Sequence, residues 1–195
     1  MSRKRVGVLI SGRGSNMAAL IEAAKAPDYP AEIALVVSNK PDAGGLATAE
    51  ANGIATATVD HRAFKGDREA FERALQAELE KQRIDIVCLA GFMRIFTPWF
   101  PSQWDGRMIN IHPSLLPAYK GLDTHARALA DGAKVHGATV HFVVPDLDAG
   151  PIILQEEVPV LAGDTPDTLA KRVLEAEHRI YPEVLRMIST EYRLV

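Results

Sequence analysis

The sequence contains a single cysteine, Cys88, and lacks any long hydrophobic run. One cysteine excludes an internal disulfide, and because Cys88 lies within the apolar stretch 84–89 we expect a buried thiol. No apolar stretch approaches the roughly 18 residues that a membrane span needs. Arg3, Lys4 and Arg5 precede only a short apolar stretch, so we expect no signal peptide. These absences predict a cytoplasmic protein that does not associate with membranes.

An excess of charge of one sign is also missing. The 22 Lys and Arg residues and the 25 Asp and Glu residues give a net charge of -3, whereas a generic nucleic-acid-binding domain is strongly basic. We therefore expect no nucleic-acid partner, and a small basic site for an anionic ligand stays compatible with the sequence. The six histidines form no H-E-x-x-H motif or Cys/His cluster, so we expect no metal. A Ser-His-Asp hydrolase is disfavoured because no G-x-S-x-G motif is present and Ser114 lies in a proline-punctuated segment.

The chain is rich in apolar residues, which make up 47% of its 195 residues and predict one domain, 1–195, with a full-sized core. In the first half, apolar runs of strand length alternate with helical patterns. The expected strands are 6–10, 33–37, 55–59 and 84–90, and the expected helices are 17–25, 44–53 and 67–82, the last capped by Asp67. Strands that are apolar throughout and alternate with helices predict a parallel sheet covered on both faces.

The second half has a different pattern. A short strand at 107–111 precedes a proline-punctuated segment, and a short helix is expected at 125–131. Two more polar strands, 135–145 and 152–160, are joined by a short turn and predict an antiparallel addition to the sheet. A long helix is expected from Thr165-Pro166 onwards. The predicted fold class is α/β and Rossmann-like, with a mostly parallel central sheet, helices on both faces and an antiparallel C-terminal addition.

The loop 11–16, Ser-Gly-Arg-Gly-Ser-Asn, follows the first strand and opens the first helix. Its backbone N–H groups and the helix N-terminus favour an anion, and glycines at 12 and 14 would let a phosphate approach the backbone. Met17 stands where a third glycine would complete a G-x-G-x-x-G motif, so a tight turn without a ligand is an equal alternative. The carboxyl ends of strands in such sheets are where ligands bind.

Two charged residues interrupt apolar helical stripes. Arg68 lies on the stripe of Phe71 and Leu75, at a helix N-terminus where the dipole disfavours a cation. Glu177 lies on the stripe of the last helix. Either residue alone could reach water from the edge of its stripe, whereas the two together indicate a polar cleft between elements.

Asn110 and His112 end a strand with i, i+2 spacing, which puts both side chains on one face. A carboxamide and an imidazole at that position suit an oxyanion site with acid–base capacity. Asp148 lies in the turn 146–151 and could be a turn former only. If Asp148 approached His112, it would favour the protonated imidazolium.

Four motifs and a fifth segment occur in order along the chain: Ser-Gly-Arg-Gly-Ser-Asn at 11–16, Leu-Ala-Gly-Phe-Met-Arg at 89–94, Asn-Ile-His-Pro-Ser-Leu-Leu-Pro at 110–117, Gly-Leu-Asp-Thr-His at 121–125 and Asp-Leu-Asp-Ala-Gly-Pro at 146–151. In this combination the chain closely resembles the phosphoribosylglycinamide formyltransferases of purine synthesis. The resemblance runs from about Val6 to the last helix.

The resemblance implies a role for each matching position. Its catalytic residues would be Asn110, His112 and Asp148. The ribonucleotide would bind at Gly14, Ser15, Asn16 and Glu177. The cosubstrate, 10-formyltetrahydrofolate, would bind at Arg68, Met93, Arg94, Ile95, Phe96, Asn110, Val144, Pro145, Asp146, Leu147 and Asp148. The N-terminal half would bind the phosphate and nucleotide and the C-terminal half the folate, with the protein a monomer or homodimer. Ala118 replaces a common Lys and Phe96 a common Leu, which affects substrate contacts rather than chemistry.

Three other functions are compatible with some of the same motifs. A formyltetrahydrofolate hydrolase shares the Asn-x-His and Asp residues, but the complete 11–16 loop favours a transferase. A methionyl-tRNA formyltransferase would carry a basic tRNA-binding extension. A non-catalytic folate- or nucleotide-binding module would not need Asn110, His112 and Asp148 together.

Overall fold

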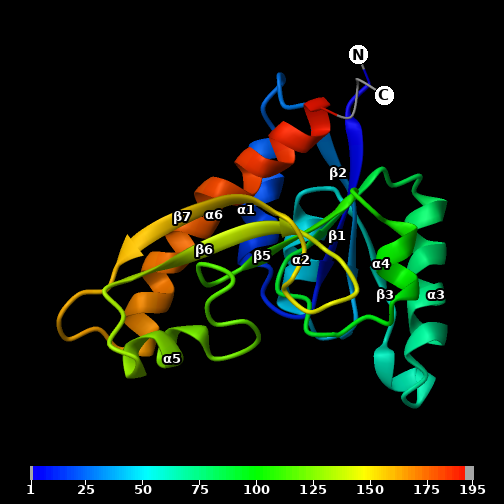
Figure 1. Cartoon of the computed structure of the whole chain (residues 1–195). Helices are drawn as coiled ribbons and strands as arrows, with labels where there is room; N and C mark the ends of the chain where they lie inside the picture. Colours follow the sequence, from blue (N-terminus) through cyan, green and yellow to red (C-terminus); the bar gives the residue numbers. More distant parts are fainter. Residues whose placement is uncertain (1, 192–195) are drawn as a thin grey trace.

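A seven-stranded sheet forms the centre of the computed structural model, which describes residues 2–191 (Figure 1). The strand order is β3-β2-β1-β4-β5-β6-β7. The strands are β1 (Lys4–Ile10), β2 (Ala31–Ser38), β3 (Ala55–Thr58), β4 (Ile86–Leu89), β5 (Met108–His112), β6 (Val135–Phe142) and β7 (Ile152–Pro159). The pairs among β1 to β5 are parallel, whereas β6 runs antiparallel to both of its neighbours. The predicted fold class is confirmed.

Helices cover both faces of this sheet. The helices are α1 (Ser15–Ala24), α2 (Gly44–Ala51), the 3-10 helix η1 (His61–Phe64), α3 (Arg68–Lys81), α4 (Trp99–Gln103), α5 (Thr124–Ala130) and α6 (Pro166–Glu191). In β1, Val8 and Ile10 belong to the core shared with α1 and α6, and Leu9 belongs to the core shared with α3 and α4. Alternate side chains of a strand point to opposite faces, so one strand supplies both cores. Figure 1 shows α1 and α6 on one side of the sheet and α3 and α4 on the other.

Helix α3 shows why the first-half elements form where the sequence predicts them. The side chain of Asp67 accepts a hydrogen bond from the backbone N–H of Ala70 at 3.0 Å, as expected of an N-cap. Phe71, Leu75 and Leu79 are buried against the sheet. Cys88 is fully buried in β4, which confirms the expected buried thiol.

Some boundaries and elements differ from the sequence expectation. The expected strand 135–145 ends at Phe142, and the remaining residues enter the loop before β7. The short elements η1 and α4 were not expected, because four or five residues are too few to show a helical period. No helix within residues 2–191 is both long and apolar enough to cross a bilayer.

Candidate active site

The order in which strands are added to the sheet changes direction between β1 and β4. From β1, the chain adds β2 and β3 on one side, and it then returns to add β4 and β5 on the other. The loops that leave the carboxyl ends of β1 and β4 diverge at this point, and such a divergence is where ligands bind in open α/β sheets. These loops are 11–14 and 90–98. The sequence-predicted phosphate loop and part of the predicted folate segment therefore start at neighbouring strand ends.

The loop 11–14 turns sharply into α1 at Gly14, which has a φ of 70°. A Cβ at Gly14 would lie 3.0 Å from the Met17 side chain. Gly45 packs against the same loop, donates its N–H to the Gly12 carbonyl at 3.0 Å, and has no room for a Cβ beside Ile10. No side chain within residues 2–191 caps the N-terminus of α1. The first N–H groups of the helix are therefore available to an anion.

Glu177 of α6 faces the start of α1 and is buried. Its residue is 7% exposed, and its Oε1 accepts a hydrogen bond from Asn16 Nδ2 at 3.3 Å. Burial raises the pKa of Glu177 to about 7, and the hydrogen bond from Asn16 opposes part of that shift. Asn16 Oδ1 is buried and lacks a hydrogen-bond partner among the described residues. This polar pair between two helices is where a ligand donor would be accommodated.

His112 has two unequal nitrogens. Its Nε2 lies 2.8 Å from the backbone carbonyl oxygen of Tyr119. Because a carbonyl only accepts, Nε2 carries a hydrogen and donates it. Its Nδ1 faces Asp148 Oδ2 at 3.5 Å. The nitrogen that can gain or lose a proton during a reaction is therefore Nδ1, and it faces a carboxylate.

Asp148 reaches this position from the loop between β6 and β7. Its backbone has a φ of 49°, and its Oδ2 accepts the Gly121 N–H at 2.9 Å. Its side chain is 7% exposed. Two separate loops therefore hold the carboxylate against the end of β5. The approach of Asp148 to His112, which the sequence left open, is present.

Asn110 pairs across the sheet with a residue that the sequence analysis missed. Asn110 and His141 are register partners on β5 and β6, and Asn110 Nδ2 lies 3.2 Å from His141 Nε2. His141 Nδ1 lies 2.9 Å from the Phe142 carbonyl oxygen, so Nδ1 donates and Nε2 accepts from Asn110. Burial lowers the pKa of His141, although the Phe142 carbonyl and Asp148 oppose the shift. Because neutral His141 accepts one hydrogen of the Asn110 amide, the second N–H of that amide has no partner among the described residues. Only the strand register, which the sequence does not specify, could have revealed this pair.

The predicted folate residues lie around the same strand ends but are less tightly joined. Met93, Ile95 and Leu147 are large apolar residues with more than half of their surface exposed. Val144 and Pro145 line a 240 Å³ pocket together with Pro101 of α4. Arg94 and Phe96 are half-buried, and Asp146 is exposed. These residues form an open apolar rim rather than a closed cavity.

Arg68 is not in contact with Asn110, His112 or Asp148. It is the first residue of α3 and is exposed, and its side chain makes no hydrogen bond or ion pair with another residue within 2–191. Ala118 is also exposed, beyond the proline-punctuated segment. Phe96 stacks on Phe92 and Phe100 with ring centroids 5.4 and 4.6 Å apart. The aromatic ring at position 96 therefore packs against the core that includes Phe71 of α3.

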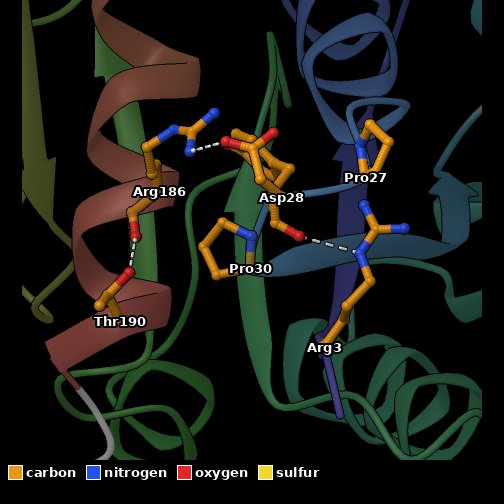
Figure 2. Close-up of a pocket in the computed structure, with 7 residues that line it drawn as sticks. Arg3, Pro27, Asp28, Pro30, Arg186 and Thr190 are labelled. Carbon is orange, nitrogen blue, oxygen red and sulfur yellow. Dashed lines mark hydrogen bonds and ion pairs between the residues drawn. The ribbon is translucent and has the colours of Figure 1, made fainter. Parts of the chain in front are cut away.

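A separate pocket of 440 Å³ lies at the opposite end of the strands (Figure 2). It lies beside Arg3, just before β1, and Pro30, just before β2. Figure 2 shows Arg186 directed toward Asp28, whose Oδ2 it meets at 3.2 Å. Arg3 Nε donates to the Tyr29 carbonyl oxygen at 3.0 Å. None of the predicted site residues lines this pocket.

At these strand ends, next to the uncapped start of α1, an Asn-x-His pair faces an aspartate. This arrangement suits a group-transfer reaction that has an oxyanionic intermediate. The chain belongs to the formyl transferase family, which it matches over residues 4–185. Within that family it belongs with the phosphoribosylglycinamide formyltransferases. The enzyme of that name from Escherichia coli is 52% identical over 178 residues, which cover 91% of this chain and 84% of the relative.

Solved structures agree with this placement. The phosphoribosylglycinamide formyltransferase of Brucella melitensis is 54% identical, with a TM-score of 0.92 and 96% of each chain covered. Glycinamide ribonucleotide transformylase 1 of Symbiobacterium toebii has a TM-score of 0.94 at 46% identity, covering 99% of this chain and 90% of the other. The human trifunctional purine biosynthetic protein adenosine-3 is 51% identical over 188 residues. This chain spans only about a fifth of the length of such trifunctional relatives (18% of the human protein).

Proposed function

We propose that this protein transfers the formyl group of 10-formyltetrahydrofolate to the amine of N1-(5-phospho-D-ribosyl)glycinamide, giving formylglycinamide ribonucleotide in the de novo synthesis of purines (IMP). The observation that carries the proposal is the meeting of Asn110, His112 and Asp148 at the carboxyl end of β5. The uncapped start of α1, which would take the phosphate, and the apolar rim of 93–96 and 144–147 support it.

The amine would attack the formyl carbon directly. A bond forms between the amine nitrogen and the formyl carbon, the carbonyl oxygen becomes an oxyanion, and the bond from that carbon to folate N10 then breaks. The proton that the amine loses matches the proton that N10 gains, so the transfer needs no other reactant. No covalent intermediate with the protein is required.

The oxyanion would lie between Asn110 and His112. Asn110 donates one N–H to His141 and has a second to offer. Protonated Nδ1 of His112 is the other donor, and Asp148 stabilises that protonated form. The distance of 3.5 Å from Nδ1 to Oδ2 exceeds that of a short charge-assisted hydrogen bond, and such contacts often tighten only when substrate binds. His112, Asp148 or a bound water would relay the proton to N10.

The two substrates would occupy adjoining surfaces. The phosphate would bind at Gly14, Ser15 and Asn16, and Glu177 would contact the glycinamide. The folate would lie over the segment 93–96 and the loop 144–148, with Arg68 and Arg94 supplying positive charge for its acidic tail. A cytoplasmic location, a monomeric or homodimeric state and activity without a metal belong to the same proposal.

The proposal is tested by mixing the purified protein with 10-formyltetrahydrofolate in the presence and absence of glycinamide ribonucleotide, and following the deformylated folate. Turnover that depends on the amine supports the proposal. Turnover without the amine would indicate a hydrolase, and no turnover under either condition would indicate a binding module.

A further inference from the structure

The segment 91–97, which precedes α4, is not held by backbone pairing. Within residues 2–191, no hydrogen bond joins a backbone group of this segment to another backbone group. Met93 and Ile95 are 62% and 61% exposed, so the segment presents apolar side chains to the surface. A chain with these properties samples several conformations unless side chains fix it.

Two side-chain anchors fix the segment near its ends. At one end, the Ser11 hydroxyl accepts the Met93 N–H at 2.8 Å and donates to Asn39 Oδ1 at 2.5 Å. Both Ser11 and Asn39 are buried at the ends of β1 and β2. Because the hydroxyl hydrogen is committed to Asn39, an oxygen lone pair is left for Met93. This anchor ties the segment to the first residue of the phosphate loop.

At the other end, the carboxyl group of Glu72 accepts the Thr97 N–H at 2.5 Å and the Thr97 hydroxyl at 2.6 Å. Glu72 is 1% exposed and lies on α3 beside Phe71. Burying a carboxyl group away from water is costly unless hydrogen bonds compensate, and both of these bonds go to one residue. A fully buried acid placed to hold a loop indicates that the conformation of the loop matters.

We propose that Ser11 and Glu72 are positioning residues for the formyl donor. They hold the segment 93–96 in its binding conformation before the donor arrives, so that less conformational entropy is lost on binding. The inference rests on the proposed function, because it takes the segment 93–96 as the surface that receives the folate. Neither residue contacts the reacting atoms in this account.

The test compares Thr97→Val with Thr56→Val. Thr97→Val keeps the shape of the side chain and removes its hydrogen bond to Glu72. Thr56→Val removes a similar bond, from Thr56 Oγ1 to Glu50 at 3.0 Å, at a surface that does not include the segment. We expect Thr97→Val to raise the KM for 10-formyltetrahydrofolate roughly tenfold, the equivalent of one lost hydrogen bond. The kcat and the KM for the amine should stay within about twofold of wild type, a range set by ordinary surface substitutions.

Glu72→Gln supplies the conservative comparison. Its Oε1 can still accept the Thr97 N–H and its amide can donate to the Thr97 hydroxyl, so we expect a KM for 10-formyltetrahydrofolate close to wild type.

Hydrogen exchange of the Met93 and Thr97 amides provides a readout besides activity, and it should accelerate in Ser11→Ala and Thr97→Val but not in Thr56→Val. An unchanged donor KM in a folded Thr97→Val variant, or an equal rise for both substrates, would overturn the inference.

The exchange measurement separates failure of this inference from failure of the proposed function. If the wild-type protein transfers no formyl group, the proposed function fails. Slow exchange of Met93 and Thr97 in the wild type, lost in the variants, would then still establish the two anchors. If transfer occurs but exchange is equally fast in wild type and variants, the segment is not pre-positioned and the inference is wrong.

Discussion

His112 illustrates how single hydrogen bonds decide what a side chain can do. The Tyr119 carbonyl accepts the Nε2 hydrogen, so in the proposed reaction proton exchange would be left to Nδ1, which faces Asp148. His141 acts similarly on Asn110 by accepting one of its two amide hydrogens. Each group is thus restricted to one role by a neighbour that makes no contact with a substrate in this account.

Replacing His112 with Ala should lower kcat by roughly 10²–10³, the usual cost of losing one oxyanion donor. Asp148→Asn should also reduce kcat strongly, because its amide can still hold the Gly121 N–H but no longer stabilises a protonated imidazole. Steady-state kinetics measure the effect, and circular dichroism checks that both variants remain folded. Turnover near the wild-type rate in either folded variant would contradict the assigned roles.

Glu177 links the site to stability through its pKa. The pKa is about 7 in the folded protein against an ordinary value of 4.5. Between these values the folded protein retains a proton that the unfolded chain has released, so stability falls as the pH rises from 4.5 to 7 and stays low above it. A shift of this size corresponds to a loss on the order of 3 kcal/mol.

Glu177→Gln, which cannot ionise, should therefore be more stable than wild type at pH 8 and equally stable near pH 4. Gln can still accept the hydrogen bond from Asn16, so the comparison isolates the charge. Urea unfolding at the two pH values gives the difference directly. A variant that is less stable than wild type at pH 8 would show that the buried carboxylate is stabilised by a partner and not penalised.

At the scale of elements, Tyr181 of α6 connects the last helix to the strands that lead to the site. Its single hydroxyl hydrogen is shared between two carbonyl oxygens, that of Leu89 on β4 at 2.8 Å and that of Ile109 on β5 at 3.2 Å. The residue is fully buried. These contacts lie at the end of the β4–β5 pairing, one residue before Asn110.

Tyr181→Phe should lower the free energy of unfolding by about 1–2 kcal/mol, because it removes the hydroxyl donor from buried carbonyls and leaves the ring in place. Chemical denaturation measures the change. A loss below about 0.3 kcal/mol would mean that these carbonyls are satisfied without the hydroxyl.

Helices and strands were predicted from the sequence wherever the repeat of apolar residues was long enough to detect. The apolar strands, the α3 stripe and the Asp67 cap were predicted because propensity, burial and capping agree there. The contacts of the site depend on strand register and on loops with unusual backbone conformations. Asn110 meets His141 only in the observed register, and the loop of Asp148 has a positive φ. Glu72 was missed although it lies on the α3 stripe, because its partner Thr97 is in an irregular segment.

At the scale of the whole molecule, topology brings the parts of the site together. The reversal of the strand order places the loops after β1 and β4 side by side, and the antiparallel pair β6 and β7 carries Asp148 back to β5. The predicted site residues, which range from loop 11–14 to Glu177 along the sequence, thus lie at one end of the sheet. The net charge of -3 does not reveal this arrangement, because Arg68 and Arg94 lie near that end while other charges form exposed pairs such as Arg73 with Glu69.

In the proposed function, the formyl group passes to an amine on this protein and not to water. The most direct measurement uses 10-formyltetrahydrofolate labelled in the formyl carbon, together with glycinamide ribonucleotide, and determines how the label divides between the amine product and free formate. We expect nearly all of the transferred label on the ribonucleotide, and we expect His112→Ala to slow its appearance there by roughly 10²–10³. Label released mainly as formate in the presence of the amine would contradict the proposed function.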